Sequence, residues 1–193
     1  ISLFSKNFTI KKMICYEASK FNFNKLIKSK YLKNDNIILN NIALGSKENK
    51  LEFFQTSESS SSTFCKIDQN SNYFKRKKNI LNFFHRKEYI LESELIEIKT
   101  LKNEFSKYDL KYIDILKIDT EGFEFDVIKG ADQYLKFVNF ILFEHHYDQM
   151  IIKNYKFSEI NEYLTKLNFK KISKFKMPLR KTFEYIYINE NLK

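Results

Sequence analysis

Glycine, proline, cysteine and tryptophan are scarce in this chain of 193 residues, which contains three Gly, one Pro, two Cys and no Trp. The two cysteines, Cys15 and Cys65, lie far apart and form no CxxC pair. Cys15 falls in an apolar run, where a free thiol behaves as a small hydrophobic side chain. This cysteine usage favours a reducing compartment, so we expect a cytoplasmic location.

Long apolar runs are absent as well. No run approaches the ~18 residues needed to span a bilayer. The longest candidate, residues 137–143, is interrupted by Asn139 and followed by Glu144. We therefore expect no membrane span in this chain. Because it begins at Ile1 rather than at a Met, the sequence leaves open a signal or an anchor upstream.

Acidic residues are outnumbered, since 34 Lys and Arg stand against 24 Asp and Glu for a net charge of +10. The run FKRKKN, residues 74–79, could contact RNA phosphates or anionic lipid. A run of four basic residues is usually a solvated loop, however, and no recognisable RNA-binding module accompanies it. We expect no nucleic-acid partner.

What the chain does contain is an alternation of strand and helix patterns over the length of one domain, with 43% hydrophobic residues to form a core. Strands are predicted at residues 11–19, 36–46, 50–56, 88–100, 112–119 and 138–146, with a terminal antiparallel pair at 170–177 and 182–190. Helices are predicted at residues 1–8, 21–32, 101–110, 123–135 and 158–169. A Ser-rich segment at 57–64 and the basic stretch after it read as the most flexible part. This alternation predicts an α/β sheet with helices on both faces.

The stretch KIDTEGFEFDVIKGAD reverses the overall charge, because four acids fall within eight residues of a basic chain. Glu121 and Glu124 are placed in the first turn of the following helix, where the macrodipole favours negative charge. Asp119 ends a buried strand, at the edge where an open α/β sheet binds its ligands. An Asp in a strand-to-helix turn is also a common helix cap, so the pattern alone leaves both roles open.

A family resemblance favours the functional role. The stretch YIDILKIDTEGFEFDVIKGA resembles the signature of the FkbM family of S-adenosylmethionine-dependent methyltransferases. CYEAS, NNIALGSKENKLEFF, SSSSTF and ILFEHH resemble further family segments in the same order. The resemblance implies a Rossmann-like class I methyltransferase sheet, with strand order 3-2-1-4-5-7-6 and S-adenosyl-L-methionine as the cofactor.

Two features depart from the family. Methyltransferases of this kind hold the cofactor with a Gly-rich loop after the first strand, but the chain's three glycines, Gly45, Gly122 and Gly130, all follow Glu17. We therefore expect residues 1–193 to be a partial methyltransferase domain that lacks its first strand and glycine loop and is inactive by itself. Lys102 also stands where the family usually has an Asp.

Cofactor contacts are expected at the ends of strands. A carboxylate that ends the second strand can accept hydrogen bonds from both ribose hydroxyls, and Glu17 fits this position. The resemblance places Asn41 and Ala43 beside the adenine. Asp119 is expected to contribute to cofactor binding and to catalysis.

Methyl transfer requires positioning and a base for a hydroxyl acceptor. Asp119, Glu144 and His146 are the catalytic candidates, with His146 as the proton acceptor and Glu144 or Asp119 orienting it. Glu121 and His145 are predicted to contact the substrate, and no metal is predicted because no ligand motif of the HExxH kind occurs. We expect an O-methyltransferase acting on a small molecule or a glycan. The alternatives are a degenerate methyltransferase fold that only binds, or an RNA methyltransferase.

Overall fold

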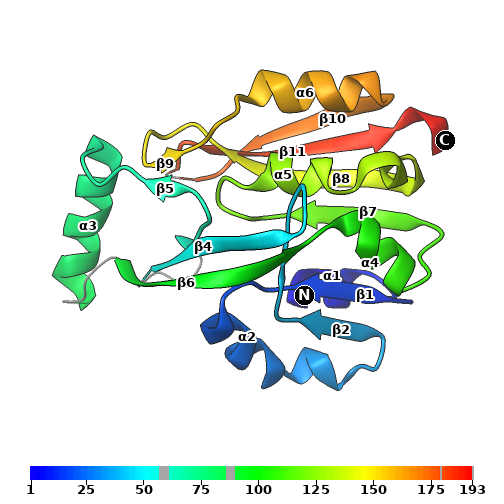
Figure 1. The fold of residues 1–193 in the computed structure, drawn as a ribbon, viewed down its shortest axis with the longest axis horizontal. Coiled ribbons are helices and arrows are strands. Elements are labelled where there is room, and N and C mark those ends of the chain that lie inside the picture. Colours follow the sequence, from blue (N-terminus) through cyan, green and yellow to red (C-terminus); the bar gives the residue numbers. More distant parts are fainter. Residues whose placement is uncertain (57–60, 86–89, 179, 193) are drawn as a thin grey trace.

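The computed structural model describes residues 1–56, 61–85, 90–178 and 180–192 (Figure 1). Its helices are α1 Ser2–Asn7, α2 Lys20–Ile27, η1 Lys30–Lys33, α3 Asn72–His85, α4 Leu101–Lys107, α5 Glu124–Lys129, η3 Asp132–Phe137, α6 Phe157–Lys166 and η4 Glu190–Leu192. Its strands are β1 Met13–Tyr16, β2 Ile37–Asn40, β3 Ala43–Leu44, β4 Asn49–Thr56, β5 Lys66–Ile67, β6 Ile90–Lys99, β7 Ile113–Ile118, β8 Val138–His146, β9 Ile151–Ile152, β10 Phe169–Lys176 and β11 Thr182–Asn189. The expected mixture of strands and helices is confirmed.

The largest sheet has the strand order β10-β11-β8-β7. β7 and β8 are parallel, whereas β11 runs antiparallel to β8, and β10 and β11 form the expected antiparallel pair. β1 and β2 form a separate parallel pair. Within the described part of the chain, no strand pairs with the edge of β7 opposite β8 or with the edge of β1 opposite β2.

The main core is formed by the four-stranded sheet and the helices packed against it. α4, α5 and α6 contribute apolar side chains to the same cluster as β7, β8 and β11. Tyr185 and Tyr187 of β11 are fully buried there, and both rings stack on Phe143 of β8. β8 is mostly buried, whereas only Ile118 is fully buried among the six residues of β7, so the burial on both faces expected from the apolar run at residues 112–119 is not found. Among the described residues, no helix is long and apolar enough to cross a membrane.

Residues 36–46 do not form one strand. The segment divides into β2 and β3, and β3 belongs to a different sheet with the order β3-β6-β4. Asn41 lies at the division, and its side-chain amide donates to the backbone carbonyls of Glu17 and Ala18, at 2.8 and 3.2 Å. The side chain thus holds the chain away from a continuous strand and fixes the segment that follows β1.

The basic stretch is a helix rather than a flexible loop. α3 begins after Ser71, whose hydroxyl accepts a hydrogen bond from the Phe74 backbone N–H. Phe74 is buried against Met150 and Ile151, while Lys75 and Arg76 are exposed. One buried aromatic thus anchors the helix, while Lys75 and Arg76 lie on its exposed side. Residues 57–60 of the predicted Ser-rich loop lie outside the described residues.

The helix after β7 is shorter than predicted, because α5 ends at Lys129 and a 3-10 helix follows. Glu121 precedes α5 instead of lying in its first turn, and its φ is +51°. Gly122 follows with φ +104°, and a Cβ there would lie 2.6 Å from Cγ2 of Ile151. Glycine is therefore required for the close packing at this turn.

Candidate functional site

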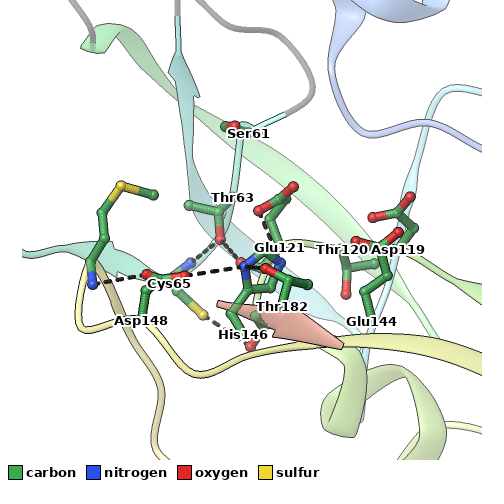
Figure 2. Close-up of polar contacts among 12 residues, drawn as sticks. Ser61, Thr63, Cys65, Asp119, Thr120, Glu121, Glu144, His146, Asp148 and Thr182 are labelled. Atoms are coloured by element: carbon green, nitrogen blue, oxygen red, sulfur yellow. Dashed lines mark hydrogen bonds and ion pairs between the residues drawn. The ribbon is translucent and has the colours of Figure 1, made fainter. Parts of the chain in front are cut away.

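Acidic side chains gather where β1, β7 and β8 end. Glu17 follows β1, Asp119 follows β7, and Glu144 lies near the end of β8. Lys117 Nζ lies 3.9 Å from a carboxylate oxygen of Asp119 and equally far from one of Glu144. Figure 2 shows these two carboxylates side by side. The three acids that we call the strand-end acids, Glu17, Asp119 and Glu144, are therefore brought to one edge of the fold.

These acids influence one another electrostatically. Burial raises the pKa of Glu17, and the negative charge of Asp119 raises it further. Burial and the Asp119 charge also raise the pKa of Glu144, whereas the nearby Lys117 lowers it. A positively charged ligand at this edge would be stabilised by the same charges that repel one another in its absence.

Glu17 is held in place by its own loop. Its carboxylate accepts a hydrogen bond from the Ser19 N–H at 2.9 Å, and Asn41 binds its backbone carbonyl. The exposed Asn41 thus lies next to Glu17. Ala43 lies deeper, buried in a small cluster formed with Phe53, Ile96 and Ile98.

A second group of polar residues surrounds His146, the last residue of β8. Its Nε2 lies 3.2 Å from an oxygen of Glu121, and its Nδ1 lies 3.4 Å from an oxygen of Asp148. The Thr182 hydroxyl lies 3.1 Å from the same Nδ1. All four side chains are buried, and Figure 2 shows them converging. We call Glu121, His146, Asp148 and Thr182 the histidine group.

The histidine group has strongly perturbed ionisation. Burial raises the pKa of Glu121 to about 7, although the charge of His146 opposes this shift. Burial lowers the pKa of His146, but the hydrogen bond to Asp148 and the charge of Glu121 outweigh burial and raise it overall. The pKa of Asp148 is lowered, because contact with His146 outweighs the effect of burial. The group can therefore exchange a proton near neutral pH.

Backbone contacts fix Glu121 in the turn. The hydroxyl of Thr63 donates to the Glu121 carbonyl at 2.6 Å, and the thiol of Cys65 donates to the Gly122 carbonyl at 3.1 Å (Figure 2). Glu124, the first residue of α5, accepts a hydrogen bond from the Gly122 N–H at 2.8 Å. Hydrogen bonds to the segment around Thr63 and to the start of α5 thus fix the turn that follows β7.

The structure brings Glu121 to His146 but not to His145. His145 points to the opposite side of β8, as strand alternation requires, and its ring contacts those of Tyr147, Tyr155 and Phe157. Burial, with the charges of Lys153 and His146, lowers the pKa of His145 to about 3. The orienting partners of His146 are Asp148 and Thr182 rather than Glu144 or Asp119.

One protein-family model matches most of the chain. This model, described as methyltransferase FkbM domain, matches residues 5–171. The chain belongs to the FkbM methyltransferase family. Membership of this family indicates that the protein is a methyltransferase. No curated protein and no solved structure gives a significant match.

The matched part of this FkbM domain contains the strand-end acids and every member of the histidine group except Thr182. Sequence reasoning missed Asp148 and Thr182. Asp148 follows the Glu-x-His pattern by two residues and could have been included as a nearby acid. Thr182 pairs with His146 only through the β8–β11 register, which no local motif reveals.

In the described ranges, no group of three or more His, Cys, Asp or Glu side chains could hold a metal ion. In the histidine group, Thr182 and Asp148 contact Nδ1 of His146, and Glu121 lies at ion-pair distance from Nε2.

Proposed function

We propose that this protein is an S-adenosyl-L-methionine-dependent O-methyltransferase with a Rossmann-like sheet, and that residues 1–193 contribute to one methyltransferase domain. The observation that carries the proposal is the adjacency of two groups with different chemistry. The strand-end acids suit a cationic, hydroxyl-rich cofactor, and the histidine group next to them suits a proton acceptor. The family membership supports the transfer of a methyl group.

The strand-end acids fit the cofactor by their charge. S-adenosyl-L-methionine carries a positive sulfonium and a positive ammonium group, and when bound it supplies an electrophilic methyl group. Glu17 would accept hydrogen bonds from the ribose hydroxyls. Asp119 would face the positive groups, with Asn41 and Ala43 on the adenine side. The charge of Asp119 already raises the pKa of Glu17, so the two carboxylates are close enough to act on one ligand.

The histidine group would take the proton of the acceptor. His146 Nε2 makes no hydrogen bond to any described residue, although it lies at ion-pair distance from Glu121. Asp148 and Thr182 hold Nδ1 and so fix the ring. When bound, the cofactor would supply the methyl group, and its C–S bond would break as the acceptor's O–C bond forms. Nε2 of His146 would take the acceptor's proton, and Glu121 and Asp148 would stabilise the resulting imidazolium.

Asp119 and Glu144 remain the other candidates for the catalytic role. Glu144 lies on the same face of β8 as His146 and has a raised pKa, so it could accept a proton in place of His146. The acceptor is a hydroxyl of a small molecule or a glycan, with Glu121 and His145 at its binding site. Free thiols at Cys15 and Cys65 support a cytoplasmic location.

Calorimetric binding of S-adenosylhomocysteine to the full-length protein tests the proposal. We expect micromolar binding, weakened at least about tenfold, or ~1.4 kcal/mol, by Glu17→Ala. Glu52→Ala is the matched control, because Glu52 is an exposed acid on β4. Absence of binding by a protein that unfolds cooperatively would favour a degenerate binding module. Equal binding by both variants would remove Glu17 from the cofactor site.

A further inference from the structure

A pocket lies beside the histidine group, at the end of β8 and the start of α6. Its volume is about 500 Å³, which is within the range of small-molecule sites. His146 and Asp148 form one side of it. The remaining wall consists mainly of His145, Tyr147, Lys153, Tyr155, Lys156 and Phe157. We call it the aromatic pocket.

Hydrogen bonds hold two of the aromatic rings of this wall. Tyr147 is 45% exposed, and its hydroxyl lies 2.7 Å from that of Tyr185. The buried Tyr155 donates its hydroxyl to Glu124 at 2.6 Å. Phe157 stacks on Tyr185, with ring centroids 4.2 Å apart. The pocket therefore presents preformed apolar ring surfaces, and binding does not have to order them.

His145 supplies the polar group of the pocket. Its side chain is only 3% exposed, and its Nδ1 is buried without a hydrogen-bond partner among the described residues. Buried polar atoms are nearly always paired, and leaving one unpaired costs ~1 to 3 kcal/mol. Because its pKa is lowered to about 3, the ring is neutral and can both donate and accept. Its environment suits a ligand hydroxyl.

The charged side chains that line the pocket also restrict the charge of the ligand that it can bind. Lys153 and Lys156 both line it, and the Lys153 ammonium group donates to the His146 carbonyl. Although aromatic surfaces can also bind cations, these two ammonium groups disfavour a positively charged ligand. A neutral or acidic ligand with one apolar face and several hydroxyls fits both the rings and His145.

We propose that the aromatic pocket binds a pyranose ring of the acceptor, with the C–H face of the sugar on Tyr147 and Phe157 and a hydroxyl on His145. This inference rests on the proposed methyltransferase function and narrows its acceptor to a glycan. His146 and Asp148 line both this pocket and the smaller cavity that contains Glu121 and Thr182. A sugar in the aromatic pocket would therefore lie on the His145 side of β8, next to the two residues that the cavities share.

Saturation-transfer NMR on the full-length protein tests this assignment, with the methyl pyranosides of glucose, mannose, fucose, rhamnose and glucuronic acid as probes. At least one should bind in the presence of S-adenosylhomocysteine. Tyr147→Ala should weaken that binding about fivefold or more, because the stacking surface is lost. Tyr147→Phe should retain it, since the ring remains. His145→Phe should weaken it while preserving the ring contacts.

Tyr112→Ala is the matched control, because Tyr112 is 43% exposed and lies before β7, away from the pocket. Equal binding by wild type and Tyr147→Ala would overturn the assignment. So would the absence of pyranoside binding by a protein that still binds S-adenosylhomocysteine, although the proposed function would then stand. Loss of S-adenosylhomocysteine binding by the wild type would instead contradict the proposed function.

Discussion

Glu124 provides the sharpest test of how the turn after β7 is built. Its side chain is fully buried. One oxygen accepts hydrogen bonds from the Gly122 N–H at 2.8 Å and the Thr120 hydroxyl at 3.2 Å, and the other accepts from the Tyr155 hydroxyl at 2.6 Å. Tyr155 can turn to the Gly122 carbonyl, 3.0 Å away, but the Gly122 N–H has no such alternative.

Glu124→Ala should therefore lower the free energy of unfolding by about 3 to 5 kcal/mol, from an unpaired buried N–H, a weakened Thr120 contact and the cavity left behind. Glu124→Gln should cost only about 1 to 2 kcal/mol, because its amide oxygen can still accept from Gly122. With a urea m-value of about 2 kcal/mol/M, the Ala variant should unfold about 2 M earlier than the wild type.

Urea titration of the full-length protein, followed by far-ultraviolet circular dichroism, measures these differences. Glu52→Ala, which removes an exposed acid, should change the free energy of unfolding by less than about 0.5 kcal/mol. If Glu124→Ala were as stable as Glu52→Ala, the buried hydrogen-bond centre described above would be wrong. If Glu124→Gln were as damaging as Glu124→Ala, the stabilisation would depend on the charge rather than on hydrogen bonds.

Two further predictions concern ionisation and packing. Because the pKa of Glu121 rises from its ordinary 4.5 to about 7 on folding, the folded state binds more protons in that window, and the free energy of unfolding should fall by up to about 3 kcal/mol as pH rises through it. Thermal melts across this range should show a shallower pH dependence for Glu121→Gln, and an unchanged slope would refute the assignment. Gly130→Ala should destabilise the fold by about 1 to 3 kcal/mol, since the new Cβ would lie 2.0 Å from the Gly45 carbonyl oxygen. Lys47→Ala, two residues from Gly45 on the surface, serves as the control in urea titrations, and equal stability of the two variants would contradict the close approach.

The strand-end acids could be predicted from the sequence, because their placement depends on a local rule. Glu17 and Asp119 each end an apolar strand, and the carboxyl ends of parallel strands meet at one edge of a sheet. The histidine group depends on tertiary pairing instead. Thr182 meets His146 through an antiparallel register, and Glu121 reaches it from a backbone conformation with positive φ. Hydrophobic periodicity carries neither kind of information.

The elements that were predicted wrongly also have physical reasons. The basic stretch in α3 looked like a solvated loop because three of its charged residues, Lys75, Arg76 and Lys78, are indeed exposed. The helix forms because one buried residue, Phe74, and a capping hydroxyl, Ser71, anchor it. Residues 36–46 looked like one strand because both halves are apolar. Asn41 divides them by binding the loop that follows β1, a contact between segments far apart in the sequence.

The cluster of acids in a basic chain now separates into two kinds. Local contacts account for the negative charges of Glu124 and Asp126. Hydrogen-bond donors surround the Glu124 carboxylate, and Asp126 contacts the Ser46 hydroxyl at 2.9 Å and the Lys129 ammonium group at 3.4 Å. Packing does not explain Asp119, which is half exposed and lies 3.9 Å from the Lys117 ammonium group. Its charge raises the pKa of both Glu121 and Glu144 and so disfavours their ionised forms in the folded state. Like charges that converge at the edge of a sheet, at a cost in stability, are characteristic of a binding site. Asp119→Asn should therefore stabilise the protein and weaken cofactor binding, whereas a purely structural Asp119 would give the opposite change in stability.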